Sequence, residues 1–133
     1  MPGNVHKFLV QLLIPRVVSL GYRIVASDQS YYTLGERKIP SPPAIARHRP
    51  DVLALKAETP IFCIGEAKTV GDLRSRHTRQ QLVDFTSVVD SHVIVAIPAS
   101  GFHILQGVLS EEGLALGPFL ECLSVPEALL PDH

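Results

Sequence analysis

The sequence predicts an α/β fold in which a central mixed sheet is flanked by helices. Short apolar runs rich in β-formers alternate with stretches whose apolar residues recur at helical spacing. Their order is helix, three strands, helix, strand, followed by an extra C-terminal helix and an edge strand. A hairpin joins the second and third strands, and a helical crossover joins the third strand to the fourth, so antiparallel and parallel pairs are both expected. With 133 residues, the chain is expected to form one domain, residues 1–133, without disulfides.

The N-terminal elements follow from apolar spacing and from breakers. Residues 4–20 predict a helix, and Gly21 stands just past its end. Pro15 is expected to kink this helix or to start a second one, because an interior proline costs about 3 kcal/mol. Residues 22–26 predict the first strand. Residues 27–50 hold four prolines and predict a long loop, which in a compact domain is usually functional.

The next two apolar runs, 51–55 and 61–68, predict a hairpin whose turn lies between Glu58 and Thr59. This register pairs Leu55 with Phe62, Leu53 with Ile64, and Asp51 with Glu66. The two carboxylates then lie side by side, where like charges are destabilising unless a cation lies between them. A slip of one residue would separate them.

Strand alternation assigns the neighbouring side chains to two faces of this hairpin. Lys68 lies on the face of Glu66, one step further along. The other face carries the small residues Cys63, Gly65 and Ala67, against which a helix could pack closely. A plain alternative for the charged residues is a surface salt bridge between Lys68 and Glu66 or Asp51.

The C-terminal half predicts two further helices and two further strands. The first helix has a stripe of Leu82, Phe85 and Val89, and Asp72 is its possible N-cap. Gly113 ends the second helix. The expected ranges are a helix over 74–90, a strand over 92–97, a helix over 101–112, an edge strand over 119–125 and a short helical turn over 126–130.

Charge is distributed unevenly along the chain, although its net charge is −1. Residues 37–79 carry nine Lys and Arg against four Asp and Glu, whereas residues 80–133 carry no Lys or Arg and seven acids. The basic middle third favours an anionic partner, with nucleic acid as the first candidate. Charge alone fits a solvated basic face equally well. The acidic final third is expected to face away from a polyanion or to contact another subunit.

Cysteine and histidine usage gives no sign of a disulfide or a zinc site. Cys63 and Cys122 both lie in apolar strand runs and are expected to be buried reduced thiols of a cytoplasmic protein. The six histidines lack zinc-ligand spacing. No apolar run approaches the length of about 20 residues that spans a bilayer, so we expect a soluble protein with no membrane partner.

The element order, with Pro50-Asp51 on the second strand and Glu66-Ala67-Lys68 on the third, resembles the PD-(D/E)xK nuclease superfamily. The resemblance covers residues 4–97. Within the superfamily, the chain resembles small Holliday-junction-resolvase-like or recombination-nuclease-like members. It implies a restriction-endonuclease-like αβββαβ core. Gln81 and Phe85 resemble the QxxxY-type element of some branches, although Gln80 could equally take the place of the glutamine.

The sequence departs from this family in the first helix, where many members carry a glutamate. Residues 4–20 contain no acid, and His6 or Gln11 is left as the candidate for that place. This departure bears on whether a second metal site exists and on activity itself.

The resemblance implies a metal-dependent endodeoxyribonuclease. Its catalytic residues would be Asp51, Glu66, Lys68 and Gln81. Asp51, Glu66 and the Ala67 carbonyl, with waters, form a hard oxygen site that suits Mg²⁺ or Mn²⁺. Adjacent carboxylates favour a charged Lys68, which would orient the attacking water or the phosphate.

The expected partners are DNA and a second copy of the chain, because small members of this fold often pair to cut two strands. DNA binding is expected to be sensitive to salt. RNA, a non-catalytic nucleic-acid-binding or regulatory module, and an interaction subunit that uses the acidic final third remain as alternatives. His48 and His77 are also candidates for a catalytic role. The predicted nucleic-acid-binding residues are Arg47, His48, Arg49, Arg74, Arg76 and Arg79.

Overall fold

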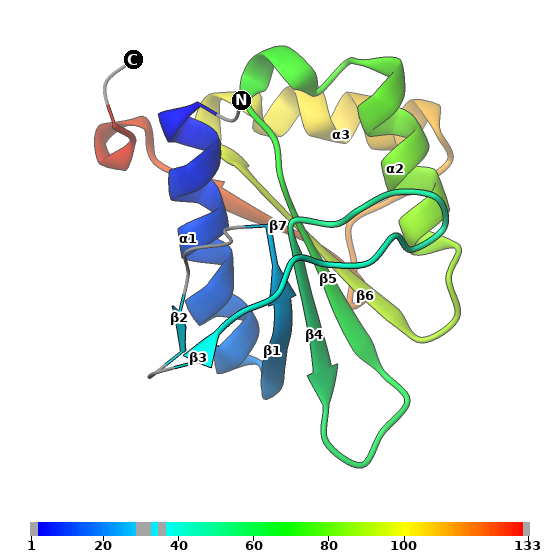
Figure 1. Ribbon diagram of the computed structural model, residues 1–133. Coiled ribbons are helices and arrows are strands. Elements are labelled where there is room, and N and C mark those ends of the chain that lie inside the picture. The colour runs from blue at the N-terminus through cyan, green and yellow to red at the C-terminus, as the bar shows by residue number, and fades with distance from the viewer. Residues whose placement is uncertain (1–2, 29–32, 35–36, 132–133) are drawn as a thin grey trace.

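A computed structural model describes residues 3–28, 33–34 and 37–131 of the chain (Figure 1). Over this part of the chain the fold is α/β, with a five-stranded mixed sheet in the order β1-β4-β5-β6-β7 and three α-helices. The predicted α/β class and the helix-flanked mixed sheet are confirmed. The elements are α1 (Asn4–Ser19), β1 (Tyr22–Ser27), β4 (Val52–Lys56), β5 (Phe62–Ala67), α2 (Arg76–Thr86), β6 (Ser91–Pro98), α3 (Phe102–Glu111) and β7 (Leu120–Val125).

Two hydrophobic layers enclose the sheet. In Figure 1, α1 covers one face, while α2 and α3 lie together over the other. The buried residues of α1 recur at helical spacing and pack on β1, β4 and β5, which is why this segment is helical. Leu82 and Phe85 of α2 and Leu105 of α3 fill the second layer. No helix of the described residues is long and apolar enough to cross a membrane.

Helix α1 runs through Pro15 without a break, so the expectation of a second helix starting there is wrong. Pro15 and Gln11, one turn earlier, are both exposed. The carbonyl that loses its bond to the proline nitrogen therefore faces water, which lowers the cost of the interruption. The helix ends as predicted before Gly21, whose φ is 93°.

A close approach between α1 and the sheet depends on Gly65. A Cβ atom at this position would lie 3.1 Å from Val52 Cβ and 3.3 Å from Leu13 Cδ1. Both distances are shorter than ordinary van der Waals contacts. The prediction that the small-residue face of this strand packs against a helix is confirmed.

The hairpin register is the predicted one. Leu55 pairs with Phe62 and Leu53 with Ile64 across the antiparallel β4–β5 pair. Strands β5 and β6 are parallel, with α2 in their connection, as the predicted crossover requires. Strand β7 also runs parallel to β6, with α3 between them in the chain. All eight residues of β6 are buried, because helices cover both faces of the sheet here.

Four local expectations need correction. Helix α2 is shorter than predicted, and its N-cap is Ser75, which accepts from Thr78 N at 3.1 Å; Asp72 belongs to a preceding 3₁₀ turn, η1 (Val70–Asp72). Val89 follows the end of α2 and is 80% exposed, so it is not part of the apolar stripe. Cys122 is only half-buried because β7 is an edge strand, whereas Cys63 is buried.

The long loop of residues 27–50 contains more structure than its prolines suggest. It includes two short paired strands, β2 (Thr33–Leu34) and β3 (Arg37–Lys38), and the buried residue Ile39. It then runs across the sheet toward α2 before it enters β4 (Figure 1). Two more 3₁₀ turns, η2 (Ala99–Gly101) and η3 (Glu127–Leu129), complete the fold.

Candidate active site

Asp51 and Glu66 meet at one end of the β4–β5 hairpin. Asp51 immediately precedes β4, and its backbone N–H donates to Gly65 O at 3.1 Å. Its carboxylate atom Oδ2 accepts from Ala67 N at 2.8 Å, which fixes the side chain against β5. The exposed fractions of Asp51 and Glu66 are 8% and 2%. The structure therefore brings the two carboxylates together at the position that the register predicts.

The electrostatics of this pair are unfavourable. Burial, and then the charge of Asp51, raise the pKa of Glu66 well above its usual value, while Lys68 acts in the opposite direction. Glu66 Oε1 is buried and has no hydrogen-bond partner among the described residues. A buried carboxylate oxygen without a partner is costly. This oxygen is therefore available to a proton or to a cation.

Lys68 is the first residue after β5, and its backbone N–H donates to Ala96 O at 2.9 Å. Its Nζ lies 3.8 Å from Glu66 Oε2 and donates a hydrogen bond to Gln81 Oε1 of α2. Lys68 is 9% exposed, so the interpretation as a surface salt bridge is wrong about the location of the pair. Burying charged groups in this way seldom adds stability, and such groups are typical of functional sites.

The structure distinguishes between the two glutamines of α2. Gln81 is buried and contacts Lys68, whereas Gln80 is exposed and donates to Asp84 Oδ1 at 2.9 Å. Phe85, one turn after Gln81, is fully buried. The two residues thus share the inward side of the helix, as their spacing predicts.

For the nuclease activity that the sequence resemblance implies, Gln81→Ala is expected to lower the cleavage rate about 10-fold or more, because Lys68 loses the acceptor that fixes its ammonium group. Gln106→Ala, which removes an exposed glutamine of α3 away from the carboxylates, is the matched control and should retain nearly full activity. Initial rates of DNA cleavage by the two folded variants provide the measurement. Equal rates for both would contradict the assigned role of Gln81.

His6, on the first turns of α1, is the helix residue that reaches the carboxylates. Its Nε2 lies 3.3 Å from Asp51 Oδ2, and its Nδ1 is buried without a partner among the described residues. The hydrogen bond to Asp51 raises the pKa of His6. Gln11, the other candidate for this place, is exposed.

Asp28 is a neighbour of the site that sequence reasoning missed. Its backbone N–H donates to Asp51 O at 2.7 Å, and its charge helps to raise the pKa of His6. A register shift between Ile24 and Ala26 precedes it, after which Ser27 pairs with Val52. The same register brings Asp28 beside Asp51. A β-bulge of this kind leaves no readable trace in the sequence.

The oxygen atoms of this site fit a small divalent cation. Two buried carboxylates stand beside the peptide of Ala67, and one of their oxygens has no hydrogen-bond partner within residues 3–28, 33–34 and 37–131. The described part of the chain holds no group of three or more His, Cys, Asp or Glu side chains that could ligate a metal. Mg²⁺ commonly uses only one or two carboxylates and completes its shell with waters and substrate phosphates. These oxygen donors therefore suit Mg²⁺.

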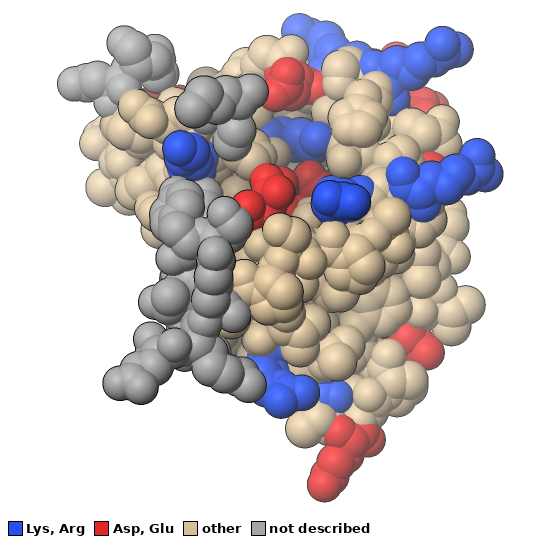
Figure 2. Space-filling view, in the orientation of Figure 1, with Lys and Arg blue, Asp and Glu red and all other residues tan. Residues whose placement is uncertain are grey.

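Basic and acidic side chains share one face of the molecule. In Figure 2 a central acidic patch has Lys and Arg side chains above it and to its right. Among the predicted nucleic-acid-binding residues, Arg47, Arg49, Arg74 and Arg76 are exposed. Arg79 instead pairs with Glu111 at 3.4 Å and Glu112 at 3.7 Å on the α3 side, and His48 is bonded to Asp84.

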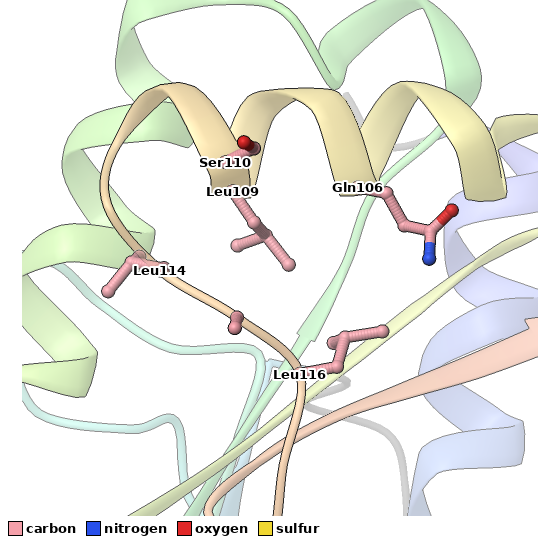
Figure 3. A pocket seen from close by; sticks show the side chains of 6 residues that line it. Gln106, Leu109, Ser110, Leu114 and Leu116 are labelled. Carbon is pink, nitrogen blue, oxygen red and sulfur yellow. The ribbon is translucent and has the colours of Figure 1, made fainter.

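A separate pocket of about 340 Å³ lies between α3 and the segment that leads to β7 (Figure 3). Leu109, Leu114 and Leu116 line it together with Gln106, Ser110 and Ala115. None of the carboxylate-site residues contributes to its wall. The pocket therefore gives no information about the chemistry of Asp51 and Glu66.

Comparisons of the chain with protein-family models, with curated proteins and with solved structures found no match. The case for a function therefore depends on the geometry and chemistry of the site.

Proposed function

We propose that the chain is a metal-dependent nuclease that hydrolyses phosphodiester bonds of DNA. The observation that carries the proposal is the buried Asp51–Glu66 pair, beside which a buried lysine stands. One carboxylate oxygen of the pair has no hydrogen-bond partner in the described part of the chain. The strand order β1-β4-β5-β6, with α1 and α2 on opposite faces, agrees with the restriction-endonuclease-like core that the sequence resemblance implies.

Each residue of the site has a part in the proposed reaction. Asp51, Glu66 and the Ala67 carbonyl would hold Mg²⁺ or Mn²⁺, which polarises the scissile phosphate and lowers the pKa of the attacking water. Lys68 would donate to the nonbridging phosphate oxygens or to that water, and Gln81 holds its ammonium group in place. Water adds to phosphorus, the P–O bond to the leaving nucleotide breaks, and the leaving oxygen takes up a proton.

The energetic cost of burying these charged groups favours a catalytic role for them over a purely structural one. An ion pair kept only for stability is usually no better than a hydrophobic pair of similar size when it is buried. Here two acids and a lysine are buried together, and one of the acids has a raised pKa. Groups with perturbed pKa values are concentrated at catalytic and binding sites.

The proposal is tested by incubating labelled DNA with the purified protein in Mg²⁺, in Mn²⁺ and in EDTA. Wild-type protein should cleave only with a divalent cation, and Lys68→Ala should lower the rate by about 10²–10³-fold because a preorganised donor is lost. Lys56→Ala is the matched control, since Lys56 lies at the opposite end of the same hairpin, and it should cleave normally. Full activity of folded Lys68→Ala would contradict the proposal.

A second candidate is a nucleic-acid-binding module that keeps the site but does not cleave. The observation in its favour is His6, which stands beside Asp51 where a further carboxylate would have strengthened cation binding. Salt-sensitive DNA binding without cleavage in either Mg²⁺ or Mn²⁺ would select this alternative. An RNA substrate tested alongside shows whether the chain acts on DNA or on RNA. We also propose a homodimer, which sedimentation of the free protein tests.

A further inference from the structure

A tight turn close to the carboxylate site is held in a strained conformation. Ile45 N donates to His48 O at 2.7 Å, and His48 N donates to Ile45 O at 3.0 Å. The two residues between them, Ala46 and Arg47, have φ angles of 50° and 73°. Glycine, which lacks a Cβ atom, and asparagine, whose short side chain can hydrogen-bond locally, usually occupy such left-handed turn positions. Strained backbone of this kind persists only where the surroundings hold it, and it is concentrated at functional sites.

The surroundings that hold this turn belong to α2. His48 Nε2 lies 2.7 Å from Asp84 Oδ2, while Gln80 Nε2 donates to the other carboxylate oxygen at 2.9 Å. The His48 ring also packs edge-on against Phe85, with 5.6 Å between the ring centroids. The side chain of His48 is 12% exposed. We refer to the contact of His48 with Asp84 and Phe85 as the His48 clasp.

Electrostatics agree with a tightly held contact. The pKa of Asp84 is lowered, and the largest cause is its hydrogen bond with His48, followed by the one with Gln80. The charge of Arg47 also contributes in the same direction, which places this arginine near the clasp. Both carboxylate oxygens of Asp84 are thus hydrogen-bonded, one to His48 of the turn and the other to Gln80.

The turn presents arginines beside the carboxylate site. Arg47 and Arg49 flank His48 and are exposed, and Arg49 lies two residues before Asp51. Across the site, Arg74 and Arg76 are exposed where α2 begins. None of these four takes part in an ion pair within residues 3–28, 33–34 and 37–131. Their charge is therefore available to an external anion.

We propose that the His48 clasp is a positioning device that holds Arg47 and Arg49 where they bind two backbone phosphates of the DNA strand entering the carboxylate site. His48 is then an anchor and makes no contact with DNA. A guanidinium group offers a rigid fork of donors that matches a phosphate group, so its placement matters more than that of a flexible ammonium. Fixing the turn before binding removes the entropy cost of ordering it. The identity of the anion as DNA rests on the proposed function.

Asp84→Ala distinguishes a positioning role of the clasp from an effect of net charge, because the two explanations predict changes of opposite sign in DNA affinity. Removing an acid from a basic surface should tighten DNA binding if only net charge matters. Loss of the clasp should instead weaken binding, by about 5-fold or more. Affinity is measured for a short labelled duplex in EDTA, so that cleavage does not contribute, and circular dichroism and thermal unfolding confirm that the variant folds.

Two further variants serve as the matched control and as a second measure. Asp72→Ala removes an exposed acid just before α2 without touching the clasp, so it should bind DNA as tightly as wild type or more tightly. His48→Ala tests the clasp from its other side and should bind as weakly as Asp84→Ala. A variant with both Arg47→Ala and Arg49→Ala should lower the slope of log affinity against log salt by about 1.8, since each phosphate contact contributes about 0.9.

The outcomes separate this inference from the proposed function. Folded Asp84→Ala or His48→Ala protein that binds DNA as tightly as wild type would overturn the clasp, whether or not the chain cleaves. Wild-type protein that shows no salt-sensitive DNA binding would overturn it as well. Weak binding by both clasp variants, in a protein that never cleaves DNA, would support the clasp and refute the nuclease.

Discussion

Glu66→Gln is expected to abolish cleavage and to stabilise the metal-free protein at the same time. Gln keeps the shape of the side chain but cannot carry the charge that a divalent cation needs, so the cleavage rate should fall about 10³-fold. Burial and the charge of Asp51 oppose the ionised form of Glu66, so the substitution should raise Tm in EDTA by about 4 °C at a pH high enough to ionise Glu66 in the wild type. Opposite effects on activity and on stability are expected of a residue retained for function.

The pH dependence of this variant follows from the direction of the pKa shift. The pKa of Glu66 is raised in the folded protein, so the folded state binds more protons than the unfolded chain above the usual carboxylate range. Stability of the metal-free wild type is therefore lost as pH rises through the folded pKa. Glu66→Gln does not titrate at this position, and its Tm should vary less over the same range.

Thermal unfolding across pH, with and without Mg²⁺, is the measurement. Saturating Mg²⁺ should stabilise the wild type, by about 2.7 kcal/mol at 100 times its Kd, and should leave Glu66→Gln nearly unchanged. Glu58→Gln in the exposed hairpin turn is the matched control and should behave like wild type. A Glu66→Gln protein that is less stable than wild type in EDTA would contradict the description of the site as charge-strained.

Phe85→Ala should be among the most destabilising single substitutions in the chain. The ring is fully buried between α2 and the sheet and also packs against His48. Truncating a buried phenylalanine costs about 3–5 kcal/mol, which corresponds to a loss in Tm of at least about 12 °C in a chain of this length. Thermal or urea unfolding of the variant measures the effect.

Phe119→Ala is the matched control, because Phe119 is 60% exposed. Its effect should stay within about 0.5 kcal/mol, as is usual at the surface. A Phe85→Ala protein as stable as the Phe119→Ala protein would show that the layer between α2 and the sheet contributes little to stability.

The core of the candidate site could be predicted because short-range rules determine it. A hairpin register is fixed by the turn and by alternation of apolar residues, so one assumption about Glu58 and Thr59 was sufficient to place Asp51 opposite Glu66. The spacing of Gln81 and Phe85 likewise placed both on one side of a helix. In each case the rule acts within a few residues.

The remaining features depend on contacts between distant segments. His6 reaches Asp51 only because of how α1 is rotated on the sheet, and helical spacing alone left Gln11 equally open. The turn at Ala46 and Arg47 carries no glycine or asparagine, so its left-handed backbone had no sequence signal. Asp84, one of the seven acids of the final third, contacts His48 only because of the path of the long loop.

Gly65 limits which amino acids evolution can accept beside this site. Any side chain there would press on Val52 and on Leu13, and Leu13 belongs to the helix that carries His6. Substituting Gly65, which has no functional group of its own, would therefore shift His6, which contacts Asp51. Among variants that keep the site intact, this position should change less than Ala57, which is exposed in the turn of the same hairpin. Deep mutational scanning would reveal this contrast as intolerance at Gly65 that catalytic chemistry alone does not explain.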